Sequence, residues 1–172
     1  MEYFIMQTDS RMRRLPQFEV SKELLSISGA GQTNRKDEVS VIYVTGNKGL
    51  NMEYPDYISS PIPLIADRLH IILKKYQQDA IFHQVVLIEK DTGTQKVYYM
   101  MIPPSLECAD KSRTAYDRAG NVLDFVLDEE CVGKNRIFRV LELKNQIAVR
   151  LDVAESILRR DAGGIWFEPL KQ

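Results

Sequence analysis

The chain has 172 residues, a length that fits one domain of ordinary size. Hydrophobic residues make up 44% of it and charged residues 27%, which excludes a wholly disordered, collagenous or coiled-coil chain. Lys and Arg number 23 and Asp and Glu number 24, so the formal net charge is −1. A strong overall charge of the kind that attracts nucleic acid or anionic membranes is therefore excluded, and we expect neither partner.

The first third of the chain predicts two strands separated by loop. Residues 3–6 are short, apolar and partly aromatic, as is typical of a strand. Residues 9–38 are poorly periodic, and we expect loop there with one helical turn near residues 21–25. A β-branched and aromatic run at residues 39–44 predicts the second strand.

The middle of the chain predicts a helix followed by a hairpin. From Ile65 onward, apolar residues recur with the spacing of one helix face, which predicts a helix over residues 63–76. Two β-rich runs at residues 80–89 and 96–102 flank a Gly-containing turn and predict an antiparallel pair. Both runs are nearly continuous in apolar residues, which indicates central strands covered on both faces.

The last third predicts further strands and one helix. Strand-like runs lie at residues 122–127, 137–140, 146–149 and 165–167. Between the last two runs, Asp152 and Glu155 have the spacing of a capping box, so we expect a helix from Asp152 that stops at Gly163 and Gly164.

Strands and helices are interleaved without regular βαβ units. This order predicts an α+β fold with a mostly antiparallel sheet and two main helices packed on it. We expect residues 1–172 to form a single domain in which residues 1–60 are the loopier portion.

The two cysteines, Cys108 and Cys131, are too few for a disulfide scaffold, although one bridge between them stays open. The Cys and His spacings match no metal site, and no glycine pattern matches a phosphate-binding loop, so we predict no metal and no cofactor. The N-terminus lacks the basic and apolar regions of a signal peptide. These features favour a cytoplasmic protein.

One enzymatic interpretation remains open, a small hydrolase or transferase that uses Cys108 or His83. Partners of a nucleophile are often distant in sequence, so spacing alone does not exclude it. However, the neighbouring Glu107 and Asp110 would raise the pKa of the Cys108 thiol and weaken it as a nucleophile. We therefore prefer a protein without a catalytic site.

The densest cluster of one sign is acidic and consists of Asp124, Asp128, Glu129 and Glu130, which we call the acidic group. Such a cluster is either solvated surface or a contact for a basic partner. A negative patch speeds the encounter with a positively charged protein and disfavours wrong partners. We predict that the acidic group binds a partner protein.

The second half of the chain resembles a family of bacterial immunity proteins from polymorphic toxin systems. The resemblance covers about residues 60–170 and rests on the order of apolar segments at 63–69, 85–88, 97–102, 137–139 and 147–169, with a polar loop at 106–112. It implies a small cytoplasmic protein that binds and neutralises a cognate toxin without catalysis. The alternatives are the small enzyme above and a structural or assembly module.

Overall fold

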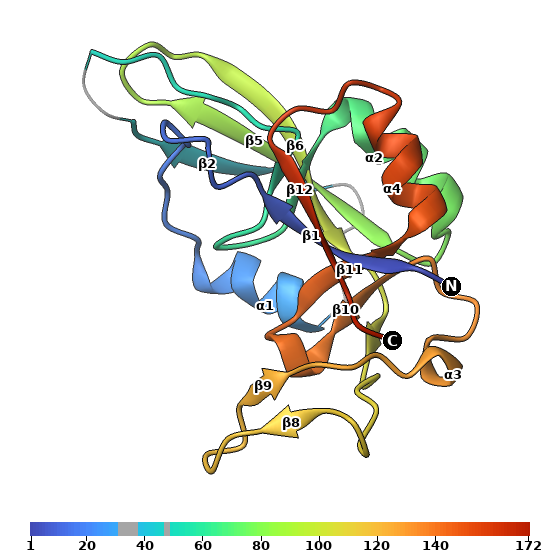
Figure 1. Ribbon diagram of the computed structural model, residues 1–172. Coiled ribbons are helices and arrows are strands. Elements are labelled where there is room, and N and C mark those ends of the chain that lie inside the picture. Colours follow the sequence, from blue (N-terminus) through green and yellow to red (C-terminus); the bar gives the residue numbers. More distant parts are fainter. Residues whose placement is uncertain (31–37, 47–48) are drawn as a thin grey trace.

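The computed structural model describes residues 1–30, 38–46 and 49–172 and has an α+β fold in which antiparallel pairing predominates (Figure 1). Two five-stranded sheets and one two-stranded sheet contain the strands. The fold class predicted from the sequence is thereby confirmed.

The first sheet joins the two ends of the chain. Its strand order is β12-β1-β11-β10-β7. The strands are β1 (Tyr3–Thr8), β7 (Ser105–Leu106), β10 (Ile137–Val140), β11 (Gln146–Arg150) and β12 (Ile165–Pro169). All pairs are antiparallel except β7 with β10. Because β1 lies between β11 and β12, the first strand of the chain is held by two strands from its last third (Figure 1).

The second sheet has the order β2-β5-β6-β4-β3. Its strands are β2 (Ser40–Val44), β3 (Tyr57–Ile58), β4 (Leu64–Ala66), β5 (Ile81–Glu89) and β6 (Gln95–Ile102). The predicted hairpin is confirmed, because β5 and β6 pair antiparallel at the centre of this sheet. The strand predicted at residues 39–44 is also confirmed as β2, which pairs with β5 in parallel at the edge.

Four α-helices complete the described part of the chain: α1 (Lys22–Ala30), α2 (Asp67–Tyr76), α3 (Glu129–Val132) and α4 (Leu151–Leu158). A 3₁₀ turn covers Leu141–Leu143, and a small hairpin pairs β8 (Ala115–Tyr116) with β9 (Val122–Asp124). Figure 1 shows α2 and α4 side by side on one side of the molecule and α1 on the other.

Three hydrophobic cores hold these layers together. The first contains residues from both sheets and from α2 and α4, including Met6, Leu69, Met101, Val149 and Ile157. The second lies between α1 and the opposite face of the second sheet. The third packs the first sheet against residues 108–132.

The helical turn predicted near residues 21–25 is the start of a longer helix, α1, so the predicted loop was wrong for residues 26–30; residues 31–37 lie outside the described ranges. Ser21 begins the helix, because its Oγ accepts a hydrogen bond from the Leu24 amide at 3.2 Å. Apolar packing then holds the helix, since Leu24 is buried in the second core.

The predicted helix over residues 63–76 begins only at Asp67. Leu64 and Ile65 instead form β4, opposite Met100 and Tyr99 of β6. Both residues are buried in this position. The helical spacing at this point was wrong because pairing with β6 satisfies the backbone and buries the same side chains.

The predicted capping box at Asp152 was also wrong. The helix begins at Leu151, and its N-cap residue Arg150 makes no side-chain cap. The Asp152 carboxylate instead accepts two hydrogen bonds from the Arg150 guanidinium, at 2.8 and 2.7 Å. The helix ends at Leu158, ahead of the two glycines.

The strand predicted at residues 122–127 is shorter in the structure and ends at Asp124.

Candidate functional site

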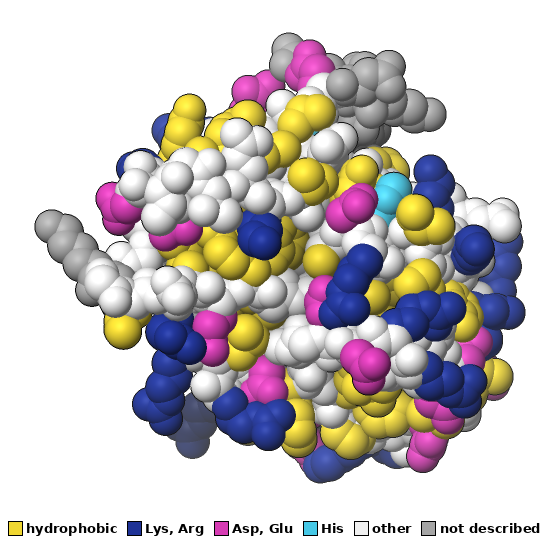
Figure 2. All heavy atoms as spheres, turned by 90° about the horizontal axis from the view of Figure 1, so that it is seen from above, with side chains coloured by type: hydrophobic (Ala, Val, Ile, Leu, Met, Phe, Trp, Pro, Cys, Tyr) yellow, Lys and Arg dark blue, Asp and Glu magenta, His cyan; other side chains and the backbone are white. Residues whose placement is uncertain are grey.

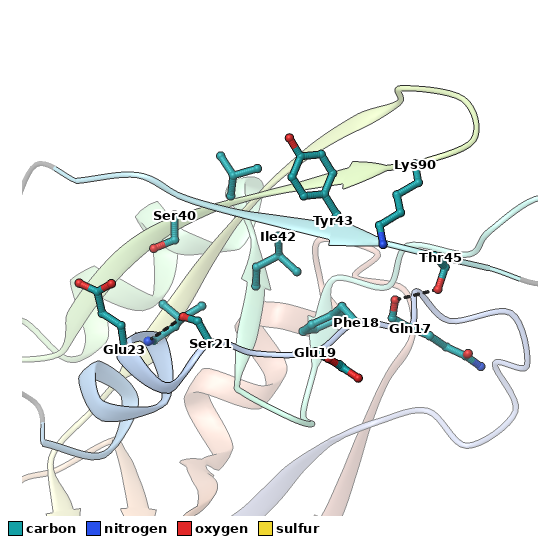
Figure 3. A pocket seen from close by; sticks show the side chains of 12 residues that line it. Gln17, Phe18, Glu19, Ser21, Glu23, Ser40, Ile42, Tyr43, Thr45 and Lys90 are labelled. Carbon is teal, nitrogen blue, oxygen red and sulfur yellow. Dashed lines mark hydrogen bonds between the residues drawn. The ribbon is translucent and has the colours of Figure 1, made fainter.

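A cavity of about 870 Å³ opens beside β2 (Figure 3). One wall is the outer edge of β2, and the other is the segment that runs from Gln17 into the first turn of α1. Ile42 and Leu24 contribute buried apolar side chains to it, and Glu19 and Lys90 contribute charged ones.

The cavity exists because the segment that pairs with the β2 edge at Gln17 separates from it after a single bridge. Gln17 and Thr45 form an antiparallel bridge in which each amide donates to the carbonyl of the other at 2.9 Å. Beyond Gln17 the chain turns away from β2 toward Ser21 and α1, so no further rungs form. The space that a continued ladder would fill is the cavity.

Within the part of the chain that the structure describes, the backbone of β2 pairs with a strand on one side only. Val44 faces β5, because its carbonyl accepts a hydrogen bond from the Lys90 amide at 3.1 Å. In a strand, the N–H and C=O groups of one residue point toward the same neighbour, and those of the next residue point to the opposite side. Thr45, Tyr43 and Val41 therefore point outward. Thr45 is paired with Gln17, but Val41 and Tyr43 have no hydrogen-bond partner on that side within the described ranges.

The side chains of β2 separate into a buried row and an exposed row. Ile42 and Val44 are buried in the second core. Val41 and Tyr43 keep 51% and 59% of their surface exposed. Figure 3 shows Tyr43 on one side of the strand and Ile42 on the other.

The exposed row continues across the second sheet. Val41 lies opposite Val86 of β5, which lies opposite Val97 of β6. Val97 is exposed, whereas Tyr99, two residues further along the same face, is stacked on His70 of α2 with 3.9 Å between ring centroids. Thus α2 covers one half of this face, and the half next to β2 presents apolar side chains to solvent.

The two candidate catalytic residues lie in different parts of the molecule. Cys108 is completely buried in the third core. His83 lies on β5, on the same face as Val85 and Leu87 of the second core. Burial, with a smaller contribution from Glu142, raises the pKa of the Cys108 thiol to about 12, so it stays protonated at neutral pH. Cys108 and Cys131 are both free thiols.

Among the described residues, His83 has one hydrogen-bond partner. Its Nε2 and Ser40 Oγ share a hydrogen bond of 2.8 Å. Burial lowers the pKa of His83, and the nearby charge of Glu38 opposes this shift. Sequence analysis did not foresee the contact, because Ser40 and His83 are 43 residues apart.

The acidic group is divided between two elements. Asp124 ends β9, and its carboxylate accepts a hydrogen bond from Lys171 Nζ at 2.5 Å. The other three residues lie at the start of α3, which Figure 1 places well apart from β9 along the lower edge.

Within α3, the three carboxylates have different contacts. Asp128 is the N-cap, and its Oδ1 accepts a hydrogen bond from the Glu130 amide at 3.0 Å. Glu129 pairs with the amino group of Met1 at 2.9 Å. No intramolecular partner of the Glu130 carboxylate is found within the described residues. Glu130 is therefore the member that is most available to a partner.

Charge elsewhere is mixed. On the face that Figure 2 shows, acidic and basic side chains are interspersed around patches of hydrophobic side chains. Within the described ranges, no cluster of His, Cys, Asp and Glu side chains has the arrangement of a metal site. None of the described helices has the length and apolar character needed to span a bilayer.

Sequence analysis predicted β2 but not its role as an edge strand with a free side. The local signal was the apolar run from Val39 to Val44, which also fits a fully buried strand. Only the pairing with a single neighbour shows that the strand is an edge.

Comparison with known protein families gives a match over nearly the whole chain. The model of the Immunity protein family (Imm11) matches residues 5–172. The chain belongs to this family. The match confirms the resemblance expected from the sequence and extends it through the first sixty residues, including α1 and β2. No curated protein matches this chain.

Proposed function

We propose that this immunity protein binds a cognate bacterial toxin of a polymorphic toxin system and neutralises it without catalysis. The observation that carries the proposal is the family match over residues 5–172. We also propose that it acts in the cytoplasm, where two free thiols are stable.

The surroundings of the candidate nucleophile support a binding role. A thiol acts as a nucleophile when it is ionised and accessible, and Cys108 is neither. It packs against apolar side chains in the third core and contributes to stability there.

The acidic group is proposed as part of the toxin-binding surface. Glu130 supports this assignment because its carboxylate has no competing intramolecular partner among the described residues. Toxins that act on nucleic acid present basic surfaces, and a carboxylate on the inhibitor would compete there with phosphate.

The first experiment is growth rescue. Under this proposal a gene beside that of this chain encodes the toxin domain. That domain is expressed in bacteria with and without this protein, and rescue by the wild-type chain is expected. Cys108→Ala and His83→Gln should rescue equally well, since neither residue contacts the toxin in this proposal. Binding of purified wild-type chain to an inactivated toxin domain, measured by calorimetry, should accompany the rescue.

Two results would contradict the proposal. One is an absence of both binding and rescue by the wild-type chain. The other is a loss of rescue in a Cys108→Ala or His83→Gln variant that is folded and still binds the toxin, because this would show that a reaction is needed.

A second candidate function is hydrolysis, and the hydrogen bond between Ser40 and His83 is the observation that favours it. A neutral imidazole beside a hydroxyl is the geometry of a base and a nucleophile. We rank it second because the His83 ring is buried on the core face of β5. A Ser40→Ala variant that rescues growth like the wild type would exclude this role in immunity.

A further inference from the structure

Among the described residues, no strand pairs with the outer edge of β2 at Val41 and Tyr43. We propose that an extended segment of the toxin adds to this edge as a new strand, in the cavity between β2 and residues 18–24. The inference rests on the proposed function and names a second surface, besides the acidic group, through which the protein would bind the toxin.

The backbone of β2 specifies what kind of partner fits. Val41 and Tyr43 each point one N–H and one C=O toward the cavity, at every second residue. An extended chain presents matching groups at the same interval, whereas a helix has already paired its own. The Gln17–Thr45 bridge shows that this edge forms antiparallel pairs where a chain lies beside it.

The cavity provides the room for this strand. If the bridge at Gln17 continued as an antiparallel ladder, Glu19 would lie opposite Tyr43 and Ser21 opposite Val41. The chain diverges instead, and a volume of about 870 Å³ takes the place of those rungs (Figure 3). The incoming segment takes the positions that Glu19 and Ser21 leave.

The side-chain rows specify the chemistry of the segment. Strand residues alternate between the two faces of a sheet, so every second toxin side chain would join the exposed row of Val41 and Tyr43. Apolar β-branched or aromatic residues fit there, because they cover the apolar surface that continues to Val97. The partner is thus an extended segment with apolar side chains at alternate positions.

The edge strand of the first sheet, β12, is protected against pairing with a further strand, and the contrast with β2 supports the proposal. The strand β12 is also an edge of five residues, but it ends in Pro169, which lacks an amide to offer a neighbour. The chain further covers its end through a bridge between Val126 and Lys171. Protein edges normally carry such protection. The strand β2 contains no proline and exposes Val41 and Tyr43.

The first test is amide hydrogen exchange of the full-length wild-type chain, with and without the inactivated toxin domain encoded beside it. In the free protein the Val41 and Tyr43 amides should exchange faster than those of Ile42 and Val44, which point toward β5. Binding should slow exchange at Val41 and Tyr43 by at least about tenfold, since each gains a hydrogen bond.

The second test uses a matched pair of variants. Val41→Pro removes the outward amide and leaves the hydrogen bonds of the ladder with β5 in place, while Val41→Ala also removes the branched side chain but keeps the amide. We expect Val41→Pro to weaken toxin binding about tenfold or more relative to Val41→Ala. Thermal melts check that both variants are folded. Ile42→Pro breaks the ladder itself and should lower the melting temperature strongly.

The outcomes separate this inference from the proposed function. If the wild type neither binds the toxin nor rescues growth, the immunity proposal fails. If the wild type binds the toxin and rescues growth while hydrogen exchange at Val41 and Tyr43 is unchanged, this inference fails and the immunity proposal stands. The edge of β2 could instead pair with a second copy of this chain. Size-exclusion chromatography with light scattering tests this, because a dimer that dissociates in Val41→Pro would show that a second copy pairs with the edge and would overturn the inference.

Discussion

Gln17 and Thr45 exchange two backbone hydrogen bonds of 2.9 Å, and the chain separates from β2 immediately beyond them. This single bridge fixes one end of the cavity. It also holds the segment that leads into α1 against the second sheet. The candidate binding site therefore depends on a contact between residues that are 28 positions apart.

Gln17→Pro should open this bridge. The substitution removes the amide that donates to the Thr45 carbonyl, and the reciprocal bond from the Thr45 amide should weaken with it. We expect faster hydrogen exchange at the Thr45 amide and a loss of about 1 kcal/mol in the free energy of unfolding. Gln17→Ala keeps the amide and serves as the control. Unchanged exchange at Thr45 would show that the bridge adds nothing to the stability of this edge.

Gly164→Ala should be strongly destabilising. Gly164 has a φ of 73°, and an added Cβ would lie 2.4 Å from both Met12 Sδ and Pro55 Cβ. We expect a loss of about 2–4 kcal/mol in urea unfolding. Gly120→Ala is the matched control, because Gly120 has a φ of 85° with open space around it and so measures backbone strain alone, about 1 kcal/mol. Equal losses in the two variants would show that the loop moves away without cost.

Stability should fall as the pH decreases from about 7 to 5. Burial lowers the pKa of His83, so below the ordinary histidine pKa of about 6.5 the unfolded chain takes up a proton that the folded chain does not. Protonation therefore favours the unfolded state. Urea unfolding at both pH values should give a smaller difference for His83→Gln than for the wild type.

Two other titratable groups, His70 and Asp9, have to be considered when the pH dependence of stability is assigned to His83. Burial also lowers the pKa of His70, so His70→Gln measures the second contribution. Hydrogen bonds from Arg11 lower the pKa of Asp9 to about 2, so stabilisation from Asp9 is lost only below about pH 4 and lies outside this range. A wild-type slope retained in His83→Gln would contradict the assignment.

Arg139→Met should loosen α1. The Arg139 side chain is only 4% exposed, and it donates to the Ser28 carbonyl in the last turn of α1 and to the Met101 carbonyl at 3.4 Å. No carboxylate of the described residues pairs with it, and its partners are these two carbonyls and Ser28 Oγ, at 3.5 Å. Methionine fills the space but leaves them unpaired, and we expect a loss of about 1–3 kcal/mol in urea unfolding. Arg118→Met, at an exposed position, should be nearly neutral; similar losses in both would contradict a specific role for Arg139.

Glu130→Lys should slow association with the toxin. The charge reversal replaces attraction with repulsion toward a basic partner, and the effect should shrink as salt shortens the Debye length from about 10 Å at 0.1 M. Surface plasmon resonance at two salt concentrations measures the association rate, and a thermal melt should be nearly unchanged. Glu155→Lys on α4 is the control. An association rate equal to that of the control would show that the acidic group is solvated surface.

Much of the fold could be predicted from local sequence. The hairpin of β5 and β6 was predictable because its two strands are adjacent in the chain and each is rich in β-branched and aromatic residues. The strands β10 and β11 and the helix α4 follow from similar short-range patterns. The same patterns led to the family resemblance, because they preserve the order of the elements.

Tertiary structure decided the features that depend on distant partners. Leu64 and Ile65 have helical spacing but form a strand, because β6 lies beside them and satisfies their backbone. Asp152 has the spacing of a cap but binds Arg150. The β2 sequence is compatible with a buried or an edge strand, and only the divergence of the chain after Gln17 leaves its outer side open. Periodicity records which side chains are apolar, whereas the pairing of backbone groups is settled by the elements that pack against them.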